Sequence, residues 1–275
     1  ELSDENKDMI RSIIPNVVFE KPEDFSYCKG IKTLYGEGNQ DTYLCIECFK
    51  QEGYDKVVWL DSDMLCVNDI SDILNYNHSM VACITKPKLN TKEHFLKNGV
   101  EKFNAGFMVI GKEHLDGRNT YVKLTSIIRK AKREKSGSNR YRVLHKTSNT
   151  FNDQDAIRIF WTNRPVYIIS DLYNFKLFGK LGMFKEHDRL LRGHLNNMKI
   201  IHYSGKRKPW ANKTDRSLTT SDGVMPGKYD VCSVADPEEM DRSLAMHLWH
   251  EYYEECFGEK CINDWYSHDK SLTWD

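Results

Sequence analysis

The chain has 275 residues, with 40 Lys+Arg and 40 Asp+Glu, so its formal net charge is zero. Hydrophobic residues make up 40% of it, which excludes an intrinsically disordered chain. A neutral chain lacks the basic excess with which nucleic-acid binders neutralise phosphates, and no apolar run reaches the ~20 residues that span a bilayer. We therefore expect a globular protein with no nucleic-acid partner and no membrane span.

Apolar spacing predicts helices in three places. Ser3 should cap a helix that stops before Pro15, residues 40–52 have helical spacing, and a final helix should run from Asp236 to a terminating Gly258. The run Lys56–Leu60 is typical of a central parallel strand buried on both faces. Other strands are expected at 17–19, 103–110, 166–169 and 200–203. Strands that alternate with helices predict an α/β architecture.

Of the eight cysteines, Cys45 and Cys48 are better explained as buried thiols on a helix than as part of a zinc site. Cys45 and Cys48 have the spacing of half a zinc site, but no second pair follows, and their neighbours are apolar. Cys256 and Cys261 could bridge a short loop. We expect free thiols in a cytoplasmic protein, with the Golgi or ER lumen as the alternative because Asn77 and Asn212 begin glycosylation sequons.

Two carboxylates directly follow the predicted strand Lys56–Leu60. Asp61 and Asp63 flank Ser62, and ligand sites of α/β sheets lie beyond the carboxyl ends of strands. Carboxylates two residues apart can face the same way and bind a hard cation. The alternative is a solvated turn, with Asp63 as a helix cap.

A second cluster follows the predicted strand at 200–203. His202 offers an imidazole nitrogen, Gly205 allows close backbone approach, and Lys208 before Pro209 supplies a positive charge. Imidazole with two carboxylates and a lysine suits a divalent cation that carries a diphosphate, with Mn²⁺ or Mg²⁺ as the candidates. A satisfied core histidine is the alternative for His202.

Two further polar groups interrupt apolar segments. Asn104-Ala105-Gly106 leaves room for a ligand, and Asn152-Asp153-Gln154-Asp155 concentrates hydrogen-bonding groups before a helical pattern. A strand bulge and a helix N-cap are the respective alternatives. Capping accounts for one residue of the second group, and four polar residues exceed what a cap requires.

These four motifs, in this order, resemble those of glycosyltransferase family 8. The matching segments are Leu-Asp-Ser-Asp, Phe-Asn-Ala-Gly, Asn-Asp-Gln-Asp and His-x-x-Gly-x-x-Lys-Pro-Trp, and the resemblance covers about residues 1–210. It implies a GT-A fold, with a Rossmann-like, mostly parallel central sheet and flanking helices. It also implies carbohydrate biosynthesis by transfer of glucose or galactose from a UDP-sugar to a hydroxyl of a glycan, protein or small molecule, with retention of anomeric configuration.

The same resemblance assigns roles to the motif residues. It implies that the DXD motif residues Asp61 and Asp63, with His202, hold Mn²⁺ or Mg²⁺. It implies a donor site formed by Asp61, Ser62, Asn104, Ala105, Gly106, Gly205 and Lys208, and a catalytic group formed by Asp153, Gln154 and Asp155. Because an amide is a poor nucleophile, we favour departure and attack on one face of the sugar.

The chain departs from the family pattern in two places. The family's first strand is missing before Glu1, so we expect upstream residues, another segment or a subunit to cover the sheet edge beside Val57–Leu60. Cys45 stands where the family usually has Arg or Lys. These departures favour a second hypothesis, a non-catalytic module that binds a nucleotide sugar or a protein. The third hypothesis is a metal-dependent phosphohydrolase. It is the weakest of the three, because the sequence lacks a second carboxylate cluster.

The domain organisation follows from the extent of the resemblance. We expect residues 1–275 to form one GT-A-like domain, with a core of about 1–210 and a C-terminal helical extension at 211–275. The aromatic residues of that extension could pack internally, form an acceptor surface or make a homodimer contact.

Overall fold

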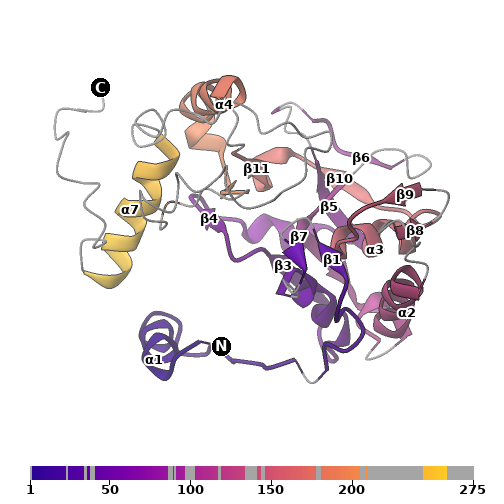
Figure 1. Ribbon diagram of the computed structural model, residues 1–275. Coiled ribbons are helices and arrows are strands. Elements are labelled where there is room, and N and C mark those ends of the chain that lie inside the picture. The colour runs from indigo at the N-terminus through magenta and orange to yellow at the C-terminus, as the bar shows by residue number, and fades with distance from the viewer. Residues whose placement is uncertain are drawn as a thin grey trace. The chain divides into compact units, whose positions relative to one another are not determined.

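The computed structural model describes residues 2–22, 24–33, 36–37, 41–85, 89, 91–96, 103–116, 119–133, 141–143, 146–177, 181–204, 209 and 244–258. The chain divides into two compact units, and Figure 1 labels the main helices and strands. Unit 1 contains Glu1–Asp61 and Ser71–Asp171, and unit 2 contains Ser62–Ile70 and Leu172–Asp275. None of the helices that the structure describes is both long and apolar enough to cross a membrane.

A five-stranded sheet forms the centre of unit 1. Its strands lie in the order β3-β7-β5-β10-β6. Their bounds are Lys56–Leu60 for β3, Phe103–Gly111 for β7, Met80–Ile84 for β5, Tyr167–Ile169 for β10 and His94–Phe95 for β6. The β5/β10 pair is parallel, and the other three pairs are antiparallel. The strands expected at 103–110 and 166–169 are therefore confirmed. The expected mostly parallel sheet is instead mixed, with one parallel and three antiparallel pairs among the described strands.

The prediction of a central parallel strand at Lys56–Leu60 is wrong in position and direction. Among the described strands, β3 lies at the edge of the sheet and pairs only with β7, in antiparallel fashion. All nine residues of β7 are buried, whereas the residues of β3 are partly exposed. A short apolar run indicates a strand, but it does not encode which neighbours the strand will find.

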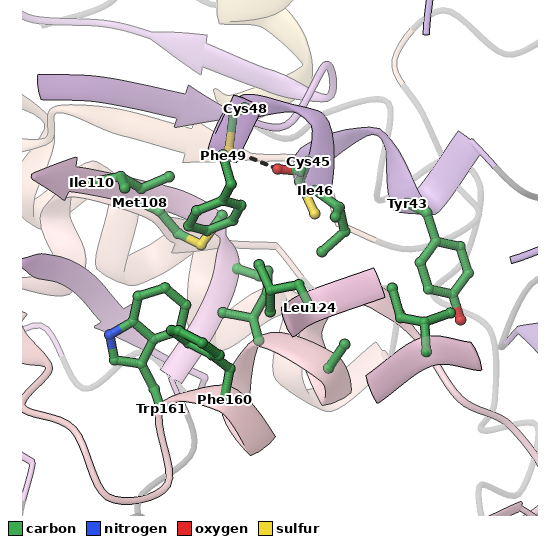
Figure 2. Packing of buried hydrophobic residues seen from close by; sticks show 14 of the residues in the cluster. Tyr43, Cys45, Ile46, Cys48, Phe49, Met108, Ile110, Leu124, Phe160 and Trp161 are labelled. Carbon is green, nitrogen blue, oxygen red and sulfur yellow. Dashed lines mark hydrogen bonds between the residues drawn. The ribbon is translucent and has the colours of Figure 1, made fainter. Parts of the chain in front are cut away.

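Helical segments cover the sheet of unit 1 and close its main core. The 3₁₀ helix η1 (Asp41–Lys50), helix α2 (Asn119–Arg133) and helix α3 (Asp153–Phe160) bury apolar side chains in one cluster with β7. Figure 2 shows Ile46 and Phe49 of η1 near Leu124 of α2 and Phe160 of α3. Burial of a side chain such as Leu124 contributes about 1.5–3 kcal/mol, so this cluster fixes the start of α3 against the sheet.

Helix α1 (Asp4–Ile13) begins and ends as its sequence predicts. The Ser3 hydroxyl accepts a hydrogen bond from the Asn6 N–H at 3.2 Å, and Pro15 follows the helix end. No residue of α1 is buried. The expected strand at 17–19 is absent from this described stretch. The remaining elements of unit 1 are β1 (Lys32–Thr33), β2 (Gly36–Glu37), η2 (Ser71–Asn75), η3 (Lys112–His114), β8 (Tyr141–Val143) and β9 (Lys146–Ser148).

Unit 2 contains a three-stranded sheet in the order β11-β12-β4. The strands β11 (Phe175–Lys176) and β12 (Ile200–His202) are parallel, and β4 (Met64–Cys66) runs antiparallel to β12. This confirms the strand expected at 200–203. Helices α4 (Leu181–His194) and α7 (Leu244–Phe257) pack on each other, and η5 (Leu195–Asn197) leads into β12. The short helix η4 (Asp171–Tyr173) begins at the last residue of unit 1.

Helix α7 ends where the sequence predicts. Gly258 has a φ of +65°, a left-handed conformation that favours glycine, and its N–H donates to the Glu254 carbonyl at 2.8 Å. The predicted start at Asp236 lies outside the described residues.

Candidate functional site

Asp61 is fixed at the end of β3. Its N–H donates to the Gly106 carbonyl at 2.8 Å, and its Oδ1 accepts from the Trp59 indole Nε1–H at 2.9 Å. Ser62 is exposed in the turn that follows, and Asp63 is partly buried. The turn therefore places two carboxylates immediately beyond a strand end.

His202 is held from both ring nitrogens at the end of β12. Its Nε2 lies 3.1 Å from Asp63 Oδ1, and its Nδ1 lies 2.8 Å from Asn174 Oδ1. Because an amide oxygen only accepts, Nδ1 carries the hydrogen of this pair. In the neutral ring the lone pair of Nε2 then faces Asp63, the arrangement in which histidines bind metals. The side chain is 4% exposed and both ring nitrogens have polar neighbours, which also fits the alternative of a satisfied core histidine. The part of His202 in a metal site stays a prediction.

Asp61, Asp63 and His202 together offer a set of metal ligands. One ligand atom of each lies within 4.8 Å of those of the other two. Ligands bound at about 2.1 Å to one ion are about 3.0 Å apart when adjacent and about 4.2 Å when opposite. The 3.1 Å between Asp63 and His202 matches the adjacent spacing. Two carboxylates and an imidazole fit Mn²⁺ or Mg²⁺, with the nitrogen ligand favouring Mn²⁺.

Two expected donor-site residues cannot be placed. Gly205 and Lys208 lie outside the described residues, while Pro209 beside them is buried. Their role in holding a diphosphate remains a prediction.

A hydrogen-bond network connects β7 to the start of α3 in unit 1. Gln154 Oε1 accepts from Asn104 Nδ2 at 2.7 Å and from the Ala105 N–H at 3.0 Å. Asn104 Oδ1 in turn accepts from the Gly106 N–H at 3.1 Å. Since a backbone N–H needs an acceptor, this network fixes the amide orientation of Gln154.

This network coincides with an irregularity in the sheet. The register of β5 against β7 jumps from Ala82↔Met108 to Cys83↔Asn104, so β7 carries extra residues at this point. The bulge predicted as an alternative for Asn104-Ala105-Gly106 is therefore present. Bulges often occur beside binding sites because they redirect side chains, so the bulge does not exclude a binding role.

Asp153 occupies the first position of α3 and contacts a thiol. Its Oδ2 lies 3.1 Å from Cys45 Sγ. Burial raises the pKa of Asp153 to about 7; the Cys45 hydrogen bond opposes this rise, and the negative charge of Asp61 adds to it. The carboxyl is therefore balanced between its two protonation states near neutral pH.

Asp155 caps α3. Its Oδ2 accepts from the Asn152 N–H at 3.1 Å, which is one half of a capping box. The predicted N-cap is thus confirmed and involves Asp155 as well as Asn152. This contact gives Asp155 a structural role, and its predicted part in catalysis stays a prediction.

Sequence reasoning missed Asn174 and Lys176. Asn174 is 1% exposed and orients His202, and Lys176 is 6% exposed and is the register partner of His202 across β11 and β12. No spacing in the sequence connects 174–176 with 202. Only the pairing of the short strands β11 and β12 brings these residues together. A prediction of that pairing would have been needed to find them.

The family model of glycosyl transferase family 8 matches residues 20–214. The chain belongs to this family. A search of curated proteins found no matching relative. The family match covers all four sequence motifs and therefore confirms the resemblance drawn from them.

The chain is similar to several solved structures. An active-site mutant of the galactosyltransferase LgtC has a TM-score of 0.52 at 15% identity, over 77% of this chain and 76% of that one. The bifunctional glycosyltransferase WbbM in its apo form gives 0.48 at 20%, over 77% and 40%. GlyE of Streptococcus pneumoniae TIGR4 gives 0.45 at 17%, over 82% and 43%. The match thus spans less than half of the WbbM and GlyE chains. The α/β class and the GT-A fold are confirmed.

Proposed function

We propose that this chain is a retaining hexosyltransferase that moves glucose or galactose from a UDP-sugar to an acceptor hydroxyl with the help of Mn²⁺. The observation that carries the proposal is the group of Asp61, Asp63 and His202, in a chain that belongs to glycosyltransferase family 8. The acceptor is a glycan, a protein or a small molecule.

The divalent cation, when bound, supplies positive charge that stabilises the departing diphosphate. Asp61, Asp63 and His202 would hold it, and Asn174 keeps the ligating nitrogen of His202 turned towards Asp63. Lys208 and Gly205 are proposed as further contacts to the diphosphate. The residues at the start of α3 are then the ones proposed to act at the sugar itself.

Gln154 is not available as a nucleophile in this arrangement, because its Oε1 already accepts two hydrogen bonds. This supports a route on one face of the sugar. The bond from the anomeric carbon to the phosphate oxygen breaks, and its electron pair leaves with UDP. The acceptor hydroxyl forms the new bond from the same face and gives its proton to the departing phosphate oxygen. Ionised Asp153 would stabilise the positive charge that develops at the anomeric carbon.

The proposal is tested by the release of UDP from UDP-glucose and UDP-galactose with Mn²⁺ across a panel of acceptors. We expect release that EDTA abolishes and that Asp63→Ala lowers about 100-fold or more. Asp55→Ala is the matched control, because this carboxylate is 92% exposed and its nearest cationic partner, Lys112, is 3.8 Å away.

The same experiment distinguishes the proposed transferase from the second hypothesis, a non-catalytic binding module. Cys45 stands where the family usually has Arg or Lys, and this departure favours a module that binds a nucleotide sugar without turning it over. Such a module would bind UDP in the presence of Mn²⁺ and release none from either donor. Full activity in Asp63→Ala would contradict the proposed metal site.

A further inference from the structure

A buried thiol and a carboxyl group meet at the start of α3. Cys45 is 1% exposed, and its Sγ lies 3.1 Å from Asp153 Oδ2, within hydrogen-bonding range for sulfur. Burial, followed by the negative charge of Asp153, raises the pKa of the Cys45 thiol well above its usual value. The thiol therefore stays protonated, and it is the donor of the pair.

The position of the Cys45 donor is fixed by the packing of η1. The Cys48 thiol donates to the Cys45 carbonyl, the bond dashed in Figure 2, at 2.7 Å, and the neighbouring Ile46 is fully buried. The Tyr43 hydroxyl donates to the Phe151 carbonyl at 2.6 Å. This bond ties η1 to the backbone two residues before Asp153, so η1 and the start of α3 are held together independently of the thiol.

The remaining groups around Asp153 are mostly negative. Asp61 and Asp155 disfavour its ionised form, and the Gln154 N–H favours it. Arg158, further along α3, is a cation whose charge interacts with Asp153, while its side chain donates to the Phe103 carbonyl at 2.9 Å. Among the residues that the structure describes, Cys45 is thus the side-chain donor that contacts the Asp153 carboxyl.

We propose that Cys45 is a positioning residue for the transfer reaction, whose thiol orients the Asp153 carboxylate and favours its ionised form. The inference rests on the proposed function, because it gives Asp153 the task of stabilising positive charge on the sugar. A neutral donor leaves the carboxyl able to take up a proton near neutral pH, so transfer should be lost as the pH falls through that range.

The sign of the expected change follows from the contact. A hydrogen bond to the charged form lowers a pKa, so its removal raises the pKa of Asp153. A hydrogen bond from a weak donor to a charged carboxylate lowers the pKa of that carboxylate by about one unit. Cys45→Ala should therefore move the titration of Asp153 up by about one unit, and Cys45→Ser should restore it.

The first measurement needs no catalysis. Protein labelled with ¹³C at the Asp carboxyl carbons is titrated by NMR without metal, and Asp153→Asn identifies the resonance. Cys28→Ala is the matched control, because Cys28 is a buried thiol of unit 1 that donates to the Phe25 carbonyl at 3.2 Å and not to Asp153. We expect the midpoint to rise in Cys45→Ala, to stay near that of the wild type in Cys45→Ser and to be unchanged in Cys28→Ala. An unchanged midpoint in Cys45→Ala, or an equal shift in Cys28→Ala, overturns the proposal.

The second measurement is the pH profile of kcat/KM for UDP release at one fixed Mn²⁺ concentration. In Cys45→Ala, the acid limb of this profile should shift to higher pH by as much as the Asp153 midpoint does. A merely structural defect would instead lower activity at every pH. If the wild type is active and Cys45→Ala has the same acid limb, the positioning role is overturned. If the NMR midpoint shifts as expected and the wild type releases no UDP, the proposed function fails, and the role of Cys45 in transfer fails with it. The hydrogen bond itself would stand.

Discussion

At the scale of single residues, the candidate site depends on hydrogen bonds that fix the direction of a few polar side chains. Asn174 orients the imidazole of His202, and Asn104 with the Ala105 N–H orients the amide of Gln154. In each case one polar atom of the side chain is held by a hydrogen bond within the protein. This leaves the other polar atom to interact with a ligand. Orientation of this kind reduces the entropy lost when a ligand binds.

Asn174→Ala should weaken Mn²⁺ binding by about 10- to 100-fold, because the imidazole loses the partner that keeps Nε2 turned towards Asp63. Calorimetric titration with Mn²⁺ measures the change. Asn68→Ala is the control, since this amide, also in unit 2, donates to the Leu195 carbonyl at 3.2 Å and not to His202. Equal losses in both variants would indicate a general loss of structure.

At the scale of elements, the sequence predicted types better than neighbours. Helix α1, the end of α7 and strands β7, β10 and β12 lie where capping signals and apolar runs place them. These features are local, since a cap or an alternation involves residues within one or two turns. The partners of β3 were predicted wrongly because pairing depends on distant segments.

The candidate site shows the same division. Asp61 and Asp63 could be found because they lie two residues apart after a strand, and His202 because it follows a second apolar run. The contacts of Cys45 with Asp153 and of Asn174 with His202 join residues 108 and 28 positions apart. Such pairs have no signature in one sequence, and only the fold brings them together.

Strand pairing also predicts a function for Lys176. Paired residues on adjacent strands share a face, so Lys176 lies on the same face as His202. The preceding Phe175 contacts His187 of α4 on the opposite face. The positive charge of Lys176 would attract a diphosphate bound on this face beside His202. Lys176→Met should therefore raise the donor KM at least about 10-fold without lowering thermal stability.

Steady-state kinetics and a thermal melt of the same sample check this prediction. Lys29→Met is the control, because this lysine is exposed in unit 1. A loss of stability in Lys176→Met with an unchanged KM would show that the lysine serves folding and not donor binding.

At the scale of the whole molecule, ligand binding and stability are linked. A cation that binds only the folded chain stabilises it in proportion to the logarithm of its concentration over Kd, by about 2.7 kcal/mol at 100 times Kd. The metal-free site holds carboxylates at Asp61 and Asp63 within a few ångströms of each other. Their mutual repulsion disfavours the folded state without metal, and the bound cation removes it.

Mn²⁺ at 100 times its Kd should therefore raise the melting temperature of the wild type by about 5 °C or more. Asp63→Ala should melt at a temperature that Mn²⁺ does not change, because the cation loses one of its three ligands. Asp55→Ala, which removes a 92% exposed carboxylate, should keep the full response to Mn²⁺. Equal stabilisation of Asp63→Ala and the wild type would place the cation elsewhere on the molecule. A response to Ca²⁺ as large as that to Mn²⁺ would argue against His202 as a ligand, because calcium prefers oxygen.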